Sequence, residues 1–270
     1  MSSRACGTGE APDIRAAMYR ILAALLLLPL AAEAQSVRAV YEVHALGSTV
    51  LELEARFEIT GDTYRVETSL RTRGLAAMFV TGEQVAQVRG GWAGAAPMPD
   101  GFSSEGVWRG RVRRIALDWQ GGDPRILELT PPEAQEREPV PEALRRGTVD
   151  VLSLVAALAR QVGRSGHCDL TTPIFDGRRR SDVDTRSEGR EVIRPWRGAW
   201  HGEALRCGFE GRLVAGFRHD QARGDAAAPQ RGTAWIAAPY AGAPAIPVRM
   251  DIPTRWFGTA TAVLLRAEPS

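Results

Sequence analysis

Apolar and charged residues alternate strictly from residue 51 to residue 59, in the sequence LELEARFEI. Residues 64–71, YRVETSLR, continue the alternation after the short link Thr60-Gly61-Asp62. Successive side chains of a β-strand point to opposite faces, so a period of two places the apolar residues on one face. The two segments therefore predict an antiparallel hairpin with one apolar face, which the rest of the chain has to cover.

Further strands are predicted along most of the chain, so the expected fold class is mainly β. In the first half they form an antiparallel meander, and in the second half they resume after a helix. The predicted strands are residues 37–45, 115–119, 126–129, 168–175, 178–185, 191–196, 203–209 and a last group within 232–266. Residues 130–146 are polar and proline-rich, which predicts a connection. Residues 219–231 lack any apolar period, which predicts a mobile loop.

One segment has the pattern of a helix, residues 148–163, TVDVLSLVAALARQVG. Its polar residues fall on a narrow stripe and its apolar residues cover most of the circumference, so we expect it to be buried on more than one side. A sheet with one apolar face meets this need when it twists and curls around the helix. The sequence thus predicts a single domain over residues 35–270, in which antiparallel strands form an incomplete barrel around one buried apolar helix.

Residues 1–34 are predicted to be an N-terminal extension with a cleaved signal peptide. The signal proper is residues 18–34, with a basic Arg20, an apolar run over 21–32 and small residues at Ala32 and Ala34. The run is shorter than the roughly 20 residues that a transmembrane helix needs. We therefore expect a periplasmic protein, cleaved near Ala34, with no stable membrane insertion after cleavage. Met18 is an alternative to Met1 as the first residue.

Cys168 and Cys207 are the cysteines that remain after such a cleavage. In an oxidising compartment they are predicted to form a structural disulfide, and the alternative is a pair of buried thiols on neighbouring strands. The formal net charge of the chain is +2. A balance so close to neutral argues against a nucleic-acid partner, whose binding selects for a dense basic surface.

Several short motifs follow one another along this frame. They are YEVHALGS at 41–48, TYRVETSLRTRGL at 63–75, GTVDVLSL at 147–154, PIFDGRRR at 173–180 between the two cysteines, IPVRMDIPT at 246–254 and FGTATAVLL at 257–265. Together they resemble a bacterial envelope family known as domain-of-unknown-function family 3108. The resemblance implies an exported, mainly antiparallel β protein. The family has no established activity, so the resemblance implies no catalytic residues and no cofactor.

The chain lacks the short motifs of common catalytic sites, such as the GxSxG nucleophile turn or the phosphate-binding loop. His44, His167, His201 and His219 are spread along the chain without the spacing of zinc ligands, so no metal and no cofactor are predicted. A catalytic triad assembled from distant residues stays open, because triads are defined by geometry.

Asp150, at the start of the predicted helix, has two interpretations. Thr148 can act as the N-cap while Asp150 stabilises the positive end of the helix from its first turn. A catalytic Asp150 needs a second ionisable group nearby, and the neighbouring residues are valines, leucines and a serine. We therefore predict that Thr148 and Asp150 begin the helix.

An apolar segment at residues 74–80, GLAAMFV, follows the first hairpin. It is interpreted either as part of the core or as an apolar lip at the mouth of the curled sheet. In the second case Leu75, Met78 and Phe79 bind a hydrophobic ligand, together with Leu154 and Leu158 of the helix.

The run from Arg178 to Arg180 also has two interpretations. Guanidinium groups bind phosphate and carboxylate well, so the run suits an anionic head group. Consecutive strand residues point to opposite faces, which prevents three adjacent arginines from serving one site and favours an ordinary solvated strand.

These patterns favour a noncatalytic protein of the cell envelope that binds a hydrophobic small molecule or an envelope protein on its curled sheet. The alternative is a hydrolase that acts on a cell-wall or glycan substrate. A glycosidase needs two carboxylates roughly 5 to 10 Å apart across a cleft, and the candidates are Asp118, Asp150, Asp176 and Asp182. A purely structural assembly partner is a third hypothesis, which the sequence does not separate from the first.

Overall fold

The computed structural model describes residues 35–74, 77, 82–254 and 258–270. The predicted signal segment and the residues Leu75, Met78 and Phe79 lie outside this range. The strands are β1 Gln35–Ala45, β2 Ser48–Ile59, β3 Thr63–Thr72, β4 Gly82–Ala93, β5 Ala96–Trp108, β6 Arg111–Gln120, β7 Asp123–Thr130, β8 Leu170–Phe175, β9 Arg180–Ile193, β10 Gly202–Ala215, β11 Gln230–Ala237, β12 Ile246–Thr254 and β13 Gly258–Pro269. The helical elements are η1 Glu133–Gln135, α3 Glu142–Arg145, α4 Val151–Ser165 and α5 Arg223–Ala226.

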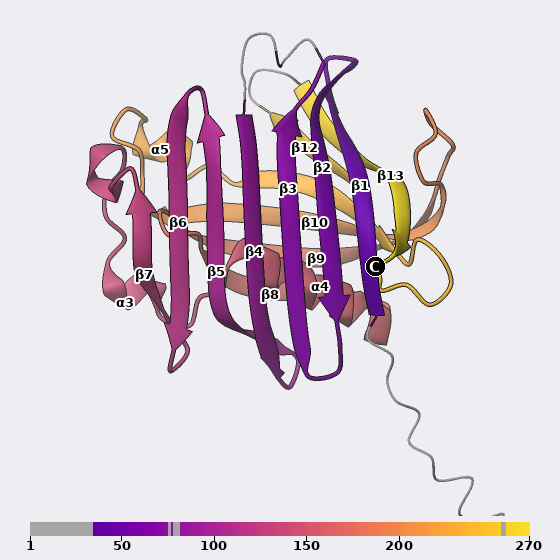
Figure 1. The fold of residues 1–270 in the computed structure, drawn as a ribbon, viewed down its shortest axis with the longest axis horizontal. Helices are drawn as coiled ribbons and strands as arrows, with labels where there is room; N and C mark the ends of the chain where they lie inside the picture. The colour runs from indigo at the N-terminus through magenta and orange to yellow at the C-terminus, as the bar shows by residue number, and fades with distance from the viewer. Residues whose placement is uncertain (1–34, 75–76, 78–81, 255–257) are drawn as a thin grey trace, which may run out of the picture. The chain divides into compact units, whose positions relative to one another are not determined.

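All these strands belong to one antiparallel sheet of 13 strands (Figure 1). Its order is β7-β6-β5-β4-β3-β2-β1-β13-β12-β11-β10-β9-β8. Neighbours in the sheet are neighbours in the chain, except where the first strand pairs with the last. The edges of the sheet are therefore β7 and β8, which come from the middle of the chain.

The hairpin predicted from the alternating residues is confirmed. β2 pairs with β3 in a register that places Phe57 opposite Val66 and Ile59 opposite Tyr64. These side chains are buried on the inner face of the sheet. In the link, the Oγ1 atom of Thr60 accepts hydrogen bonds from the backbone N–H groups of residues 62 and 63, at 3.2 and 2.9 Å. The turn is thus fixed by its own threonine.

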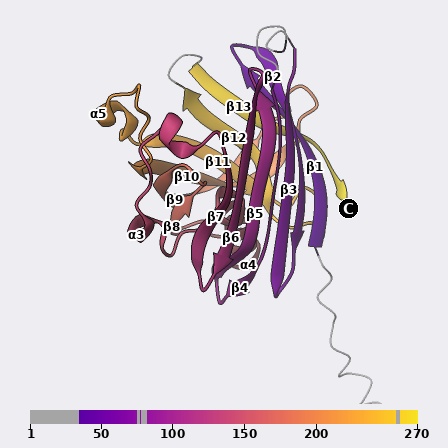
Figure 2. The same cartoon turned by 60° about the vertical axis from the view of Figure 1, so that its left-hand side comes forward.

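The sheet curls so that its first seven strands face the last six across α4 (Figures 1 and 2). α4 contacts β2, β3, β4 and β5 of the first half and β8 and β11 of the second. Ala156 and Ala159 of α4 are almost fully buried, in one core cluster with Val66 of β3 and Phe175 of β8. Small side chains on the helix let strands of both halves approach it closely. The predicted incomplete barrel around one buried apolar helix is therefore confirmed.

The gap between the two sheet edges is bridged by the chain that leads into α4. The backbone N–H of Val149 donates to the carbonyl oxygen of Pro173 at 3.1 Å, and its carbonyl accepts from the N–H of Phe175 at 2.8 Å. On the other side, the indole N–H of Trp119 in β6 donates to the carbonyl oxygen of Thr148 at 2.8 Å. Residues 148 and 149 therefore join the two halves of the sheet. No helix within the described residues is long and apolar enough to cross a membrane.

The predicted start of the helix is wrong by two to three residues. Asp150 is the N-cap, with extended backbone angles, and α4 runs from Val151 to Ser165 instead of 148–163. Thr148, predicted as the N-cap, donates its hydroxyl to the carbonyl oxygen of Arg145 at 2.6 Å. The reason is that Val149 is extended to pair with β8, so the first helical turn begins after it. The helix is capped at its C-terminus by Gly166, which has a φ of +72°.

Several strand boundaries also differ from the prediction. β4 and β5 were not predicted, because glycines and prolines such as Gly90, Gly91, Pro97 and Pro99 interrupt the alternation. Residues 178–185 and 191–196, predicted as two strands, contribute to the single strand β9. Residues 219–231, predicted as a loop, contain α5 and the beginning of β11. Residues 130–146 form the predicted connection, with η1 and α3 inside it.

The predicted disulfide is present between Cys168 and Cys207, whose Cα atoms lie 6.2 Å apart. Both residues are buried. The bridge links the chain just before the edge strand β8 to β10, across β9. It closes a loop with a sequence separation of 39 residues, which restricts the unfolded chain.

We expect the double variant Cys168→Ala, Cys207→Ala to lose about 3 kcal/mol of free energy of unfolding, because the loop is no longer closed in the unfolded state. Urea unfolding followed by tryptophan fluorescence measures the loss. The reduced wild-type protein is the matched control and should lose a similar amount. An unchanged urea midpoint in the double variant contradicts the prediction.

Candidate functional site

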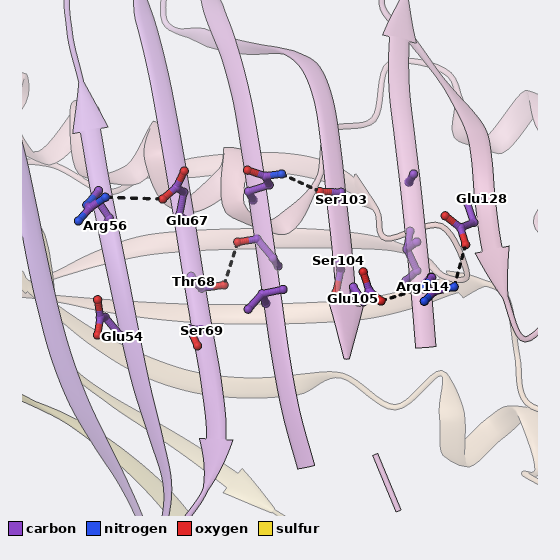
Figure 3. Close-up of a pocket in the computed structure, with 15 residues that line it drawn as sticks. Glu54, Arg56, Glu67, Thr68, Ser69, Ser103, Ser104, Glu105, Arg114 and Glu128 are labelled. Carbon is purple, nitrogen blue, oxygen red and sulfur yellow. Dashed lines mark hydrogen bonds and ion pairs between the residues drawn. The ribbon is translucent and has the colours of Figure 1, made fainter. Parts of the chain in front are cut away.

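Two pockets of the described residues differ in their charge pattern, and one of them lies on the outer face of β2–β7 (Figure 3). It measures about 480 Å³ and is here called the outer pocket. Its charged residues pair with one another: Arg114 bonds Glu105 at 2.9 Å and lies 4.0 Å from Glu128, and Arg56 lies 4.0 Å from Glu67 (Figure 3). Exposed pairs of this kind are common on sheet surfaces and contribute little. The outer pocket is therefore the weaker candidate.

The other pocket lies on the inner side of the sheet, beside the start of α4, and is here called the inner pocket. It measures about 770 Å³, within the usual range of ligand pockets. Its walls come from β4, β5, β6, the first residue of α4, the connection after β7, the turn between β8 and β9, and the chain after β10. The apolar lining residues are Phe102, Val107, Trp108, Ile115 and Val151, and the charged ones are Glu83, Arg113, Glu136, Arg137, Asp176, Arg178, Arg179 and Arg218.

The apolar wall of the inner pocket contains two large side chains that are not fully buried. Trp108 is 41% exposed and Val151 is 43% exposed. A Cβ atom on Gly82 would lie 2.2 Å from Cε3 of Trp108, so only a glycine lets the indole lie against β4. The fold thus holds an aromatic ring at the pocket wall without covering it.

The charged wall carries five arginines and three carboxylates, a net charge of +2. Arg113 binds Glu136 with both terminal nitrogens, at 3.0 and 2.7 Å, and lowers the pKa of that carboxyl. Arg179 binds Asp176 through Nε at 2.7 Å. Glu136 and Asp176, two of the three carboxylates of the pocket, are therefore already engaged. Arg218 is bound by Asp220, which does not line the pocket, so the other lining residues, four arginines and three carboxylates, carry an excess charge of +1.

Arg178 is a buried arginine of the inner pocket that is incompletely paired. Its side chain is only 7% exposed, and its Nη2 donates to the carbonyl oxygen of Pro131 at 2.7 Å. Its Nη1 is buried and finds no hydrogen-bond partner among the described residues, with the nearest Glu136 oxygen at 3.9 Å. Burial, and next the charge of Arg113, lower the pKa of Arg178. A buried cation without a full partner is costly, so it needs an explanation.

The turn between β8 and β9 places Arg178 and Arg179 at the same pocket. One oxygen of Asp176 accepts from the backbone N–H groups of Arg178 and Arg179, at 2.9 and 2.7 Å. The rule that adjacent strand residues face opposite ways therefore does not apply to them, because β9 begins only at Arg180. Arg180 turns away and binds Asp182 at 2.8 Å. The anion-binding interpretation thus concerns two of the three arginines.

The chain after β10 completes this wall. Residues 136–138 pair with residues 217–219 through two backbone hydrogen bonds, and Nη1 of Arg137 donates to the carbonyl oxygen of Gly216 at 2.8 Å. Gly216 has a φ of +87°, and a Cβ atom there would lie 2.1 Å from the carbonyl oxygen of Arg178. Only a glycine therefore lets the chain after β10 pack this closely on the backbone of Arg178. Burial also lowers the pKa of Arg137.

The ligand-binding residues predicted on the helix do not line the inner pocket. Leu154 is buried, and Leu158 packs against a second core cluster that includes both disulfide cysteines. The helix contributes Val151 to the pocket instead. Sequence reasoning missed Trp108, Arg113 and Arg137, because they come from separate segments that meet only in the folded chain.

The candidate carboxylates of a hydrolase lie in separate settings. Asp118 binds Arg125 at 2.7 Å, Asp176 holds the β8–β9 turn and Asp182 binds Arg180. Asp150 is fully buried at the helix start. No group of three or more His, Cys, Asp or Glu residues in the described part of the chain is placed to hold a metal ion.

Asp150 belongs to a buried hydrogen-bonded cluster. Its Oδ1 accepts from the backbone N–H groups of Leu152 and Ser153, at 2.9 and 3.0 Å, and its Oδ2 accepts from the hydroxyl of Ser153. The same hydroxyl lies 2.7 Å from the phenol oxygen of Tyr64 in β3. Burial raises the pKa of Asp150. The carboxyl therefore caps α4 and ties it to the sheet.

Comparisons with known proteins agree with this architecture. The family model described as "Protein of unknown function (DUF3108)" matches residues 38–265. A crystal structure of a beta-barrel-like protein of domain of unknown function DUF1849 from Brucella abortus is similar, with a TM-score of 0.52 and 12% sequence identity. The similarity covers 87% of this chain and 98% of that chain, and at this identity it shows the fold alone. None of the curated proteins matches the chain.

We expect the stability of Asp150→Asn relative to wild type to increase as the pH rises from 4 to 7. Because burial raises the pKa of Asp150, its stabilising contribution is complete below its unfolded pKa of about 4 and is lost as the pH rises through its folded pKa. Asparagine keeps the acceptor oxygen and does not titrate. Urea unfolding of both proteins at several pH values measures the difference.

Asp150→Ala is the matched control, since it removes the acceptor. It should be less stable than Asp150→Asn by about 1 kcal/mol across the same pH range. If the stability of Asp150→Asn ran parallel to that of the wild type with pH, the buried carboxyl would not be the titrating group.

We expect Arg178→Met to keep or raise the free energy of unfolding, by about 0 to 2 kcal/mol, because it replaces an incompletely paired buried cation with an apolar side chain of similar length. Arg180→Met is the matched control. Arg180 is 14% exposed and donates to Asp182 and to the carbonyl oxygen of Leu144, so its loss should cost about 1 kcal/mol. A larger loss for Arg178→Met than for Arg180→Met, by thermal or urea unfolding, contradicts this expectation.

Proposed function

The chain belongs to the DUF3108 family of proteins of unknown function, and from this premise we propose that it is a noncatalytic exported protein that binds a hydrophobic ligand in the inner pocket. The observation that carries the proposal is the partly exposed apolar wall formed by Trp108 and Val151. Concave apolar surfaces next to a few polar groups are the usual form of small-molecule sites. Burying Trp108 and Val151 in the core would stabilise the fold, but here both side chains stay partly exposed at a pocket.

The proposed location is the periplasm. The disulfide between Cys168 and Cys207 supports an oxidising compartment, because disulfides rarely persist in a reducing cytosol. Residues 18–34 have the composition of a cleaved signal, which agrees with this location. In this proposal the protein works as a carrier or receptor in the cell envelope, and an envelope protein that contacts the same pocket is the competing ligand.

The chemistry of the inner pocket supports binding over catalysis. Its positive groups are arginines, which stay protonated and do not exchange protons at neutral pH. A glycosidase needs one carboxyl whose pKa is raised, so that it can donate a proton. The pKa of Glu136 is instead lowered by Arg113. The hydrolase hypothesis therefore draws no support from this pocket.

We expect the purified protein to bind the uncharged aromatic probe N-phenylnaphthylamine with a rise in probe fluorescence, and Val151→Asp to weaken this binding by about tenfold or more. A carboxylate in the first helical turn is compatible with the helix, so the variant should fold. Fluorescence titration measures the affinity, and circular dichroism checks the fold.

Val192→Asp is the matched control. Val192 is 67% exposed on β9 and is not among the residues that line the inner pocket, so this change should leave probe binding unaltered. Native mass spectrometry of protein purified from its own host should also show a bound small molecule. The proposal is contradicted if the wild-type protein does not bind the probe, or if Val151→Asp binds it as tightly as the wild type.

A further inference from the structure

The inner pocket joins an apolar wall to a wall with surplus positive charge. We propose that its ligand is an amphiphile whose anionic head group, a phosphate or a carboxylate, binds at Arg113, Arg178 and Arg179, with its apolar part against Trp108 and Val151. This inference rests on the proposed function and specifies the ligand class. It follows from three properties of the charged wall.

The first property is the state of Arg178. Its side chain is more than nine-tenths buried, lines the pocket, and leaves Nη1 without a hydrogen-bond partner among the described residues. The protein bears the cost of dehydrating this cation and recovers only part of it through the carbonyl oxygen of Pro131. An anion at the pocket wall supplies the missing electrostatic compensation.

The second property is that Glu136 and Asp176, two of the three carboxylates of the pocket, are already engaged by hydrogen bonds. Glu136, which lies 3.9 Å from Nη1 of Arg178, has both oxygens bound by Arg113. Asp176 receives three hydrogen bonds from the backbone and side chain of the β8–β9 turn. Glu136 and Asp176 act on the guanidinium of Arg178 through their charge alone, without a hydrogen bond to its Nη1. An anion bound at the pocket would add to this incomplete compensation.

The third property is access. The side chains of Arg113 and Arg179, which line the same pocket as the buried Arg178, are about two-fifths and one-half exposed, so an incoming group can reach them. A guanidinium group matches the geometry of phosphate and carboxylate oxygens and is more weakly hydrated than an ammonium group. Two exposed arginines in one pocket with a buried third are therefore suited to binding an anionic head group.

The position of the apolar wall determines the rest of the ligand. Trp108 and Val151 come from β5 and from the start of α4, whereas the arginines come from β6, the β8–β9 turn and the neighbouring connections. A free inorganic anion would contact only the arginines and leave the indole of Trp108 exposed. A neutral apolar molecule would contact only Trp108 and Val151 and leave Arg178 incompletely compensated. An amphiphile contacts both sets of residues.

The test compares three probes by displacement of N-phenylnaphthylamine and by calorimetry: decyl phosphate, decanol with the same alkyl chain, and inorganic phosphate. We expect decyl phosphate to bind the wild-type protein at least about tenfold more tightly than decanol, since the head group contacts a partly buried charge. Arg178→Met should remove most of this difference, and the affinity for decanol of the same variant separates a lost head-group contact from a general loss of binding. Arg180→Met, whose arginine does not line the pocket, should keep the difference.

The outcomes separate the two proposals. If the wild-type protein binds none of the probes, the proposed function is overturned, and this inference with it. Equal binding of decanol and decyl phosphate overturns the inference alone, and so does an equal preference for decyl phosphate in wild type and Arg178→Met. If inorganic phosphate binds as tightly as decyl phosphate, the arginines form a site for a free anion, and the proposal of an amphiphilic ligand is overturned.

Discussion

The structure depends on three successive residues that lie between the edges of one sheet. The carbonyl of Thr148 accepts from the indole of Trp119 in the first half, Val149 pairs with the edge strand β8 of the second half, and Asp150 caps α4. A curled sheet with one apolar face and two unpaired edges needs such a joint, because its buried edge would otherwise leave backbone groups without partners. Three residues thus fix both halves of the sheet and the helix relative to one another.

The inner pocket lies where the barrel is closed by turns and connections instead of by pairing between its edge strands. Because β7 and β8 do not pair, the gap is filled by turns and connections, and these bring arginines instead of the apolar side chains of a regular strand. Gly216 allows the chain after β10 to pack on the backbone of the β8–β9 turn, which carries the buried Arg178. The proposed amphiphile would therefore complete a wall that the sheet itself leaves unfinished.

The sequence predicts what local patterns encode, and it fails where distant segments meet. The period of two around Phe57 and Val66 identifies the first hairpin, and the apolar circumference of residues 148–163 identifies the central helix. The strands β4 and β5 were not predicted, because their glycines and prolines, which the sheet accommodates, interrupt the alternation of apolar and polar residues. The arginines of the β8–β9 turn are evident in the sequence, but the turn that holds them depends on Asp176 and packs against a glycine 38 positions after Arg178. No local pattern encodes that packing.

The pairing of β1 with β13 has a consequence for how the chain acquires its structure. Strands β1 to β7 can form from neighbouring segments, each soon after the one before it. The seam at the centre of the sheet joins residues more than two hundred positions apart, and loop closure on that scale slows folding. Because a chain is synthesised from its N-terminus, one edge of β1 has no partner until the last strand has been made. During that interval the half-apolar β1 has an open edge, which is a site for aggregation and makes shielding by a chaperone most valuable before synthesis ends.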